Sequence, residues 1–265
     1  MRSLDMKKVG LVLGIIAGII VCIISCNKLQ SDHPQAKLAP EANTLSEEDI
    51  KMYEDSVNLI LPELQKQESL VYEQGDNSFY VIKYSHNGEP VLYVENEDNG
   101  EYGKSEKRYY LKERRLLLYT ENTQSYNTSE RLMQNRLYFR GNTLFSSLQK
   151  TGPDAKSLHS ETLKAFTPKE REQYLEIPEM EDALNQRGKF NLVFDGITQY
   201  PKARFLILSR GEFNSYRAVL RIEKEDELIN ELSSDPSRYT GTKFDLNWQI
   251  NSEGEAVYTS GRIKR

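Results

Sequence analysis

The sequence predicts a mainly β protein with a few helices, an α+β chain in which an antiparallel meander sheet precedes a small five-stranded barrel. Between residues 69 and 148, short runs rich in β-branched and aromatic residues alternate with turn sequences, as strands and hairpins do. A stretch without such runs follows at 151–188. After residue 189 come three more runs, one amphipathic helical pattern and two final runs. These observations predict a sheet domain over 46–150, a helical connector over 151–188 and a barrel domain over 189–265.

A helix is expected ahead of the sheet. Ser46 is a good capping residue, and Asp49 stands where its side chain reaches back to complete a capping box. Apolar residues then recur at helical spacing, namely Ile50, Tyr53, Val57, Ile60, Leu61 and Leu64. Pro62 should kink or end the helix, because proline lacks the amide hydrogen that a helix interior needs. We expect the apolar stripe to pack on the sheet rather than to face a partner.

Seven runs predict the strands of the meander: SLVYEQ, SFYVIKY, PVLYVEN, KRYYLK, RLLLYT, NRLYFR and TLFSSL. The turns between them contain glycine or asparagine, which supply the positive φ of tight hairpins, as in His86-Asn87-Gly88. Tyrosines recur along the runs, at Tyr80, Tyr84, Tyr93, Tyr109, Tyr110, Tyr119 and Tyr138. We expect them to pack across strands. The alternative is an exposed row that binds sugar or peptide.

The connector carries two helix signals. Thr167 and Pro168 suit the cap and the first position of one helix, and a second short helix is expected from near Pro178 to before Gly188. The barrel domain then reads KFNLVFDG, ARFLILS, SYRAVLRI, the helical EKEDELINELSSD, KFDLNWQI and AVYTSGRI. This element order resembles an OB-type barrel, although other five-stranded folds share it. Trp248 alternates with Phe244, Leu246 and Ile250, so these four should share a face in the core.

The chain opens with MRSLDMKKVGLVLGIIAGIIVCIISC, in which Lys7 and Lys8 precede an apolar run of 17 residues. A charged start followed by an apolar run is the layout of an export signal. The run ends in Ile23, Ile24, Ser25 and Cys26, which resembles the lipobox of bacterial lipoproteins. The resemblance implies that residues 1–25 are a signal peptide removed before Cys26, and that Cys26 is lipidated with acyl chains such as palmitate.

A single transmembrane helix is the alternative for this segment. Its apolar run is short for a bilayer core, which takes about 20 helical residues. Gly10, Gly14 and Gly18 recur at the spacing that lets two membrane helices pack closely. Under either interpretation the protein is tethered to a lipid bilayer.

Lipidation at Cys26 has consequences for the mature chain. Cys22 leaves with the signal peptide, so no free thiol remains and the fold depends on its core. Residues 26–45 are polar, with Pro34 and Pro40, and are expected to form a flexible tether. The mature chain has 32 basic and 39 acidic residues, a net charge of −7 that gives no reason to bind nucleic acid. Asn27, in place of aspartate, favours the outer membrane by resemblance to enteric lipoproteins.

The sequence predicts no catalytic residue and no cofactor. The three histidines, His33, His86 and His159, lie beside no plausible nucleophile and show no metal-ligand spacing. Glu95, Glu97, Asp98 and Glu101 surround Gly100, and calcium prefers such oxygen ligands, but we expect a solvated turn there rather than a metal site. A second acidic group, Glu223, Glu225, Asp226 and Glu227, should place negative charge at a helix N-terminus.

These observations favour a bacterial envelope lipoprotein facing the periplasm, with a noncatalytic binding or scaffold role toward another envelope protein or a cell-wall glycan. Two alternatives remain. One is a hydrolase that acts on cell-wall material. The other is a single-span membrane protein with a periplasmic β domain.

Overall fold

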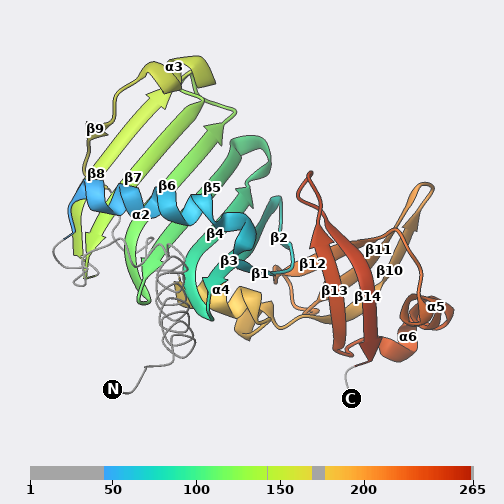
Figure 1. The fold of residues 1–265 in the computed structure, drawn as a ribbon. Helices are drawn as coiled ribbons and strands as arrows, with labels where there is room; N and C mark the ends of the chain where they lie inside the picture. The colour runs from blue at the N-terminus through green and yellow to red at the C-terminus, as the bar shows by residue number, and fades with distance from the viewer. Residues whose placement is uncertain (1–44, 142, 169–176, 264–265) are drawn as a thin grey trace, which may run out of the picture. The chain divides into compact units, whose positions relative to one another are not determined.

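The computed structural model describes residues 45–141, 143–168 and 177–263, all within one compact unit that spans residues 41–265. This part is mainly β with few helices, as predicted, and most of it is an open antiparallel sheet (Figure 1). The predicted signal peptide, the lipidation at Cys26 and the body of the helix expected after Pro168 lie outside the described residues.

The predicted meander is confirmed. Six strands pair antiparallel in chain order: β3 (Asn77–His86), β4 (Glu89–Asp98), β5 (Gly103–Lys112), β6 (Arg115–Ser125), β7 (Leu132–Arg140) and β8 (Thr143–Gly152). The short strands β1 (Gln65–Glu68) and β2 (Tyr72–Gln74) pair with β3, and β9 (Lys164–Ala165) pairs with β8. Asn87 and Gly88 both have positive φ, 50° and 81°, which a tight hairpin with a right-handed twist requires.

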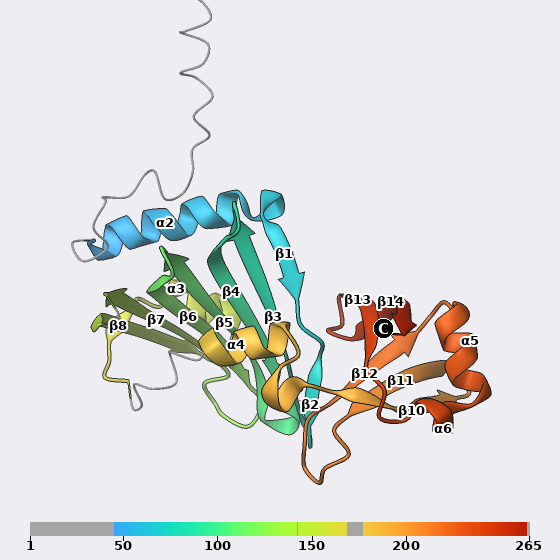
Figure 2. The same ribbon diagram turned by 90° about the horizontal axis from the view of Figure 1, so that it is seen from below.

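The helix α2 (Glu47–Leu59) lies across one face of the meander (Figure 2). Its predicted capping box is present: the Asp49 amide donates to Ser46 Oγ at 3.2 Å, and the Ser46 amide donates to Asp49 Oδ2 at 2.9 Å. Ile50, Tyr53 and Val57 are buried beneath it, which confirms that the apolar stripe packs on the sheet. The helix ends before η3 (Leu61–Glu63), a short 3-10 turn that contains Pro62.

The opposite face of the meander packs against α4 (Ile177–Leu184), the second helix that the sequence predicts. Met180, Ala183 and Leu184 are buried there, and the Tyr72 hydroxyl donates to the Ala183 carbonyl at 2.7 Å. A further helix, α3 (Ala155–Ser160), lies in the connector ahead of its two predicted helices, and Asp154 caps it. Two 3-10 turns, η4 (Gly100–Tyr102) and η6 (Gly188–Phe190), complete this part of the chain.

The C-terminal elements follow the predicted order. The strands β10 (Val193–Tyr200), β11 (Ala203–Ser209) and β12 (Arg217–Ile222) form an antiparallel group. The helices α5 (Glu227–Ser234) and α6 (Pro236–Tyr239) come next, and the antiparallel pair β13 (Phe244–Ile250) and β14 (Ala256–Ile263) ends the described chain. β14 pairs in parallel with β12, and β12 also pairs with β2, so backbone hydrogen bonds join these strands to the meander.

The four residues predicted to share a face around Trp248 all belong to or pack against the hydrophobic core. Phe244 is buried within it, while Leu246, Trp248 and Ile250 are partly buried at its margin. The indole Nε1 of Trp248 donates to the Ser69 carbonyl at 2.9 Å, next to strand β2. Trp248 therefore packs against the core from its margin, where the sequence predicted a place within it.

Candidate functional site: a groove on the sheet

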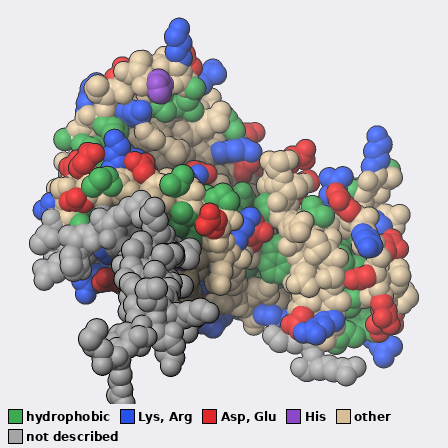
Figure 3. Space-filling model, viewed as in Figure 1, with side chains coloured by type: hydrophobic (Ala, Val, Ile, Leu, Met, Phe, Trp, Pro, Cys, Tyr) green, Lys and Arg blue, Asp and Glu red, His purple; other side chains and the backbone are tan. Residues whose placement is uncertain are grey.

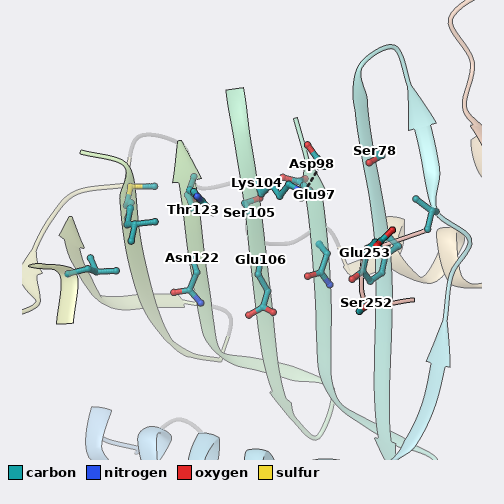
Figure 4. Close-up of a pocket in the computed structure, with 18 residues that line it drawn as sticks. Ser78, Glu97, Asp98, Lys104, Ser105, Glu106, Asn122, Thr123, Ser252 and Glu253 are labelled. Carbon is teal, nitrogen blue, oxygen red and sulfur yellow. Dashed lines mark hydrogen bonds and ion pairs between the residues drawn. The ribbon is translucent and has the colours of Figure 1, made fainter. Parts of the chain in front are cut away.

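A groove of about 450 Å³ opens on the face of the meander that carries α2 (Figure 4). α2 covers one part of this face, where its Glu54 pairs with Arg136 of β7 and its Asn58 accepts from the Tyr110 hydroxyl of β5 at 3.1 Å. The groove occupies positions farther along the same strands. It is lined mainly by β3 to β7, with contributions from α3 and from the turn between β13 and β14.

Strand register builds the groove floor. Alternate residues of a strand point to the same face, and partners in neighbouring strands stand side by side. One such row runs Tyr80, Asn96, Glu106 and Asn122, each directly opposite the next, and continues to Gln134 beyond the residues that line the groove. The neighbouring row runs Ser78, Asp98, Lys104, Gln124 and Leu132. The floor is therefore an ordered array of amide, hydroxyl and charged groups.

Apolar groups stand at the two ends of this array. At one end Leu132 of β7 lies with Leu158 of α3, and at the other Val71 lies with the Tyr80 ring. The turn between β13 and β14 approaches at the second end, where Ser252 and Glu253 lie beside β3 (Figure 4). Gly254 lies near this ring, since a Cβ added at Gly254 would be at ordinary van der Waals distance, 3.9 Å, from Tyr80 Cε1.

The groove carries an excess of negative charge. Asp98 pairs with Lys104 at 2.9 Å, and Glu106 pairs with Arg108 at 2.8 Å. The hydrogen bond and charge of Asp98 raise the pKa of Lys104 above its ordinary value, so the amine stays protonated. Glu253 adds a further carboxylate from an exposed position.

Two exposed tyrosines stand on the loops at the ends of the groove strands. Tyr102 in η4 is 75 % exposed and Tyr126, after β6, is 45 % exposed. The Tyr126 amide donates to the Tyr102 carbonyl at 3.3 Å, which joins the two loops. The Tyr126 phenol lies near enough to Lys104 to contribute to the raised pKa of its amine. These tyrosines place aromatic surface beside the polar floor.

The other face of the same strands carries a polar row that is buried at Glu95 and Asn135 and partly buried elsewhere. Glu95, Lys107, Glu121, Asn135 and Gln149 stand opposite one another in register across β4 to β8. Lys107 Nζ donates to Glu95 at 2.9 Å and to Glu97 at 2.7 Å. The Asn135 amide donates to Glu121 and accepts from Gln149, both at 2.9 Å.

Glu95 and Glu97 behave as a coupled pair around one lysine. Burial, followed by the hydrogen bond with Glu97, raises the pKa of Glu95 to about 8, against the opposing charge of Lys107. Burial also acts to raise the pKa of Glu97, but the hydrogen bond with Glu95 and the charge of Lys107 outweigh it and hold that pKa below its ordinary value. One negative charge is thus shared by two carboxyl groups at neutral pH.

The sequence expectation of a solvated acidic turn is wrong for Glu95, which is only 5 % exposed. Strand alternation also divides the acidic cluster, because Glu95 and Glu97 face Lys107 while Asp98 faces Lys104 on the other side. Within residues 45–141, 143–168 and 177–263, no group of three or more histidine, cysteine, aspartate or glutamate side chains is arranged to hold a metal ion.

The tyrosines, Asp226 and two of the histidines singled out in the sequence lie in or at the ends of strands and helices. Tyr80 and Tyr84 are half-buried, and Tyr80 lines the groove. Five others are buried in the sheet, deeper than expected, namely Tyr93, Tyr109, Tyr110, Tyr119 and Tyr138. Asp226 caps α5, which confirms the expected negative charge at that helix start. His86 ends β3 and His159 lies in α3.

Sequence reasoning missed the groove residues Asn96, Glu106 and Asn122. The sequence shows only that unbroken polar runs occupy the end of β4, the start of β5 and the end of β6. Their alignment into one row depends on pairing register, which no single strand specifies.

Comparison with known proteins returned no match: no family model, no curated protein and no solved structure is significantly similar to this chain. Among the helices of the described residues, none combines the length and apolar content needed to cross a bilayer.

Proposed function

We propose that this chain is a lipid-anchored bacterial envelope lipoprotein that binds, without catalysis, another envelope protein or a cell-wall component. The groove on the meander is the proposed binding site. The observation that supports this most is the array of amide, hydroxyl and carboxylate groups on its floor, bounded by apolar side chains. Binding sites commonly combine apolar walls with a few placed polar groups.

The described C-terminal strands are proposed to form an OB-like barrel. Their spatial order, β10-β11-β12-β14-β13, and the parallel pairing of β12 with β14 support this proposal. The Phe194 amide donates to the Thr242 carbonyl at 2.9 Å, and the Gly241 amide donates to the Phe194 carbonyl at 2.8 Å. These bonds bring β10 against the chain entering β13, where such a barrel closes.

The anchor is tested by growing cells with a clickable palmitate analogue. The wild-type chain should carry the label and lose its leader, whereas Cys26→Ala should remain unlabelled and uncut. Cys22→Ala is the matched control, because that cysteine lies within the leader, and it should be labelled like the wild type. Equal labelling of Cys26→Ala, or an unlabelled wild type with its leader intact, contradicts the proposed anchor.

The binding role is tested with a photo-crosslinking amino acid in intact cells. Placed at Asn122 in the groove, it should capture a defined envelope component on irradiation. Placed at Lys202, in the exposed turn between β10 and β11, it should not capture that component. No capture from Asn122, equal capture from both positions, or turnover of a wall substrate by the purified protein contradicts the proposed function.

A further inference from the structure

We propose that the groove takes a neutral or amino-bearing oligosaccharide laid across β3 to β7. This inference rests on the proposed function and names the ligand class of the same site. It is argued from the chemistry of the floor, the position of the groove on the sheet, its charge and its aromatic groups.

The floor suits a ligand that presents many hydroxyl groups. A side-chain amide offers both a donor and an acceptor, as a sugar hydroxyl does, so amides and vicinal hydroxyls satisfy one another. Asn96 and Asn122 stand on either side of Glu106 in the same row, and Gln124 lies in the next row. The Asn122 Oδ1 already accepts from Gln134 at 3.0 Å, which fixes the amide so that its nitrogen is the group left to donate.

The groove lies on the face of the sheet rather than along an edge. An extended peptide bound by a sheet usually adds a strand at an edge, where free backbone groups pair with its own. Here the floor strands β4, β5 and β6 are paired on both sides, so their backbone groups are already used. Side chains alone must make the polar contacts, which favours a ligand whose polar groups are hydroxyls over a peptide backbone.

The charge of the groove disfavours anionic sugars. Asp98 is balanced by Lys104 and Glu106 by Arg108, so Glu253 leaves these groups with one negative charge in excess. A uronic acid or phosphorylated sugar would meet carboxylates of the same sign, whereas an amine would gain from them. Glu106 lies at the centre of the floor row, so an amine laid across the row would share this carboxylate with Arg108.

The dimensions and aromatic groups agree with a chain of sugars. The row from Ser78 to Leu132 crosses four strand spacings of about 4.8 Å, or roughly 19 Å in all, which is longer than one sugar ring. The Tyr80 ring lies at one end, and the exposed Tyr102 and Tyr126 lie on the loops beside the second row. Aromatic rings pack well against the apolar C–H face of a sugar ring.

The inference is tested by calorimetric titration of the full, detergent-solubilised protein. The probes are the β-1,4-linked tetramers of N-acetylglucosamine and of glucosamine, the tetramer of galacturonic acid, and an uncharged Ser/Ala hexapeptide. Both glucosamine-based tetramers should bind at one site, the amino form more tightly, and the galacturonic acid tetramer should bind at least about tenfold more weakly.

Three variants test where the tetramers bind and distinguish the hydrogen bond of Asn122 from the charge of Glu106. Asn122→Ala should weaken binding of both glucosamine-based tetramers by about tenfold, the cost of losing one well-formed hydrogen bond. Glu106→Gln keeps the size of the side chain, so it should abolish the preference for the amino form while retaining binding of the N-acetyl form. Gln199→Ala, on the exposed part of β10, is the matched control and should bind like the wild type.

The contradicting outcomes separate this inference from the proposed function. If the galacturonic acid tetramer or the hexapeptide binds most tightly, and Asn122→Ala loses that binding, the groove still binds a ligand but the proposed class of oligosaccharide is overturned. Binding of sugars that is unchanged in Asn122→Ala places them elsewhere and overturns the inference. Failure of every probe, together with captured envelope material from Asn122 in cells, overturns the ligand class alone. Failure of both experiments overturns the proposed function as well.

Discussion

At the scale of single residues, burial leaves Glu95 and Glu97 to compete for the one positive charge of Lys107. This lysine is partly buried and donates to both Glu95 and Glu97, so one positive charge faces two groups that could each be negative. A second negative charge in this environment would lack a counter-ion and most of its hydration. Glu95, the more buried of the two, therefore holds its proton to about pH 8.

The raised pKa of Glu95 predicts a specific pH dependence. Its folded-state pKa of about 8 lies above the ordinary value of 4.5, so the folded protein binds this proton more tightly than the unfolded chain. That contribution to stability is fully present below about pH 4.5 and is lost as the pH rises toward about 8. Glu95→Gln mimics the protonated form, so its free energy of unfolding should fall less than that of the wild type between about pH 5 and about pH 9.

Urea unfolding at about pH 5 and about pH 9 measures how far the free energy of unfolding of each protein falls. Glu101→Gln is the control, because it removes the same charge from an exposed position in η4 and should follow the wild-type pH dependence. If the free energy of unfolding changes with pH by the same amount in the wild type and in Glu95→Gln, the assignment of a raised pKa to Glu95 is contradicted.

At the scale of elements, local signals were sufficient for some features and insufficient for others. The Ser46–Asp49 capping box and the Asn87-Gly88 turn depend on residues close in sequence, and both are present as predicted. The burial of Glu95 was missed because its partner Lys107 comes from the next strand. The groove rows were missed for the same reason, since they require the register of five strands at once.

The start of α2 offers a test at this scale. Ser46→Ala removes the side-chain oxygen that accepts from the Asp49 amide, so it should lower the free energy of unfolding by about 1 kcal/mol. Ser56→Ala is the matched control within the same helix. Its hydroxyl bonds only to the Met52 carbonyl one turn back, and alanine has the higher helix propensity, so this change should cause little loss. Equal losses measured by urea unfolding would show that the cap does not stabilise α2.

At the scale of the whole molecule, the groove unites segments that are distant in sequence. Its floor comes from β3 to β7, one end from α3 and the other from the turn that joins β13 and β14. The bond from Trp248 to Ser69 and the pairing of β2 with β12 hold the C-terminal strands at the meander edge that this turn reaches. On the face seen in Figure 3, Lys, Arg, Asp and Glu side chains are scattered over the surface, so the ordered polar rows of the groove are a more specific feature than its charge alone.

The most direct test of this account compares glucosamine-tetramer titrations of the wild type, Asn122→Ala and Gln199→Ala. The account predicts one saturable site in the wild type, a dissociation constant about tenfold higher in Asn122→Ala, and no change in Gln199→Ala. Identical isotherms for all three proteins would contradict the assignment of binding to the sheet groove.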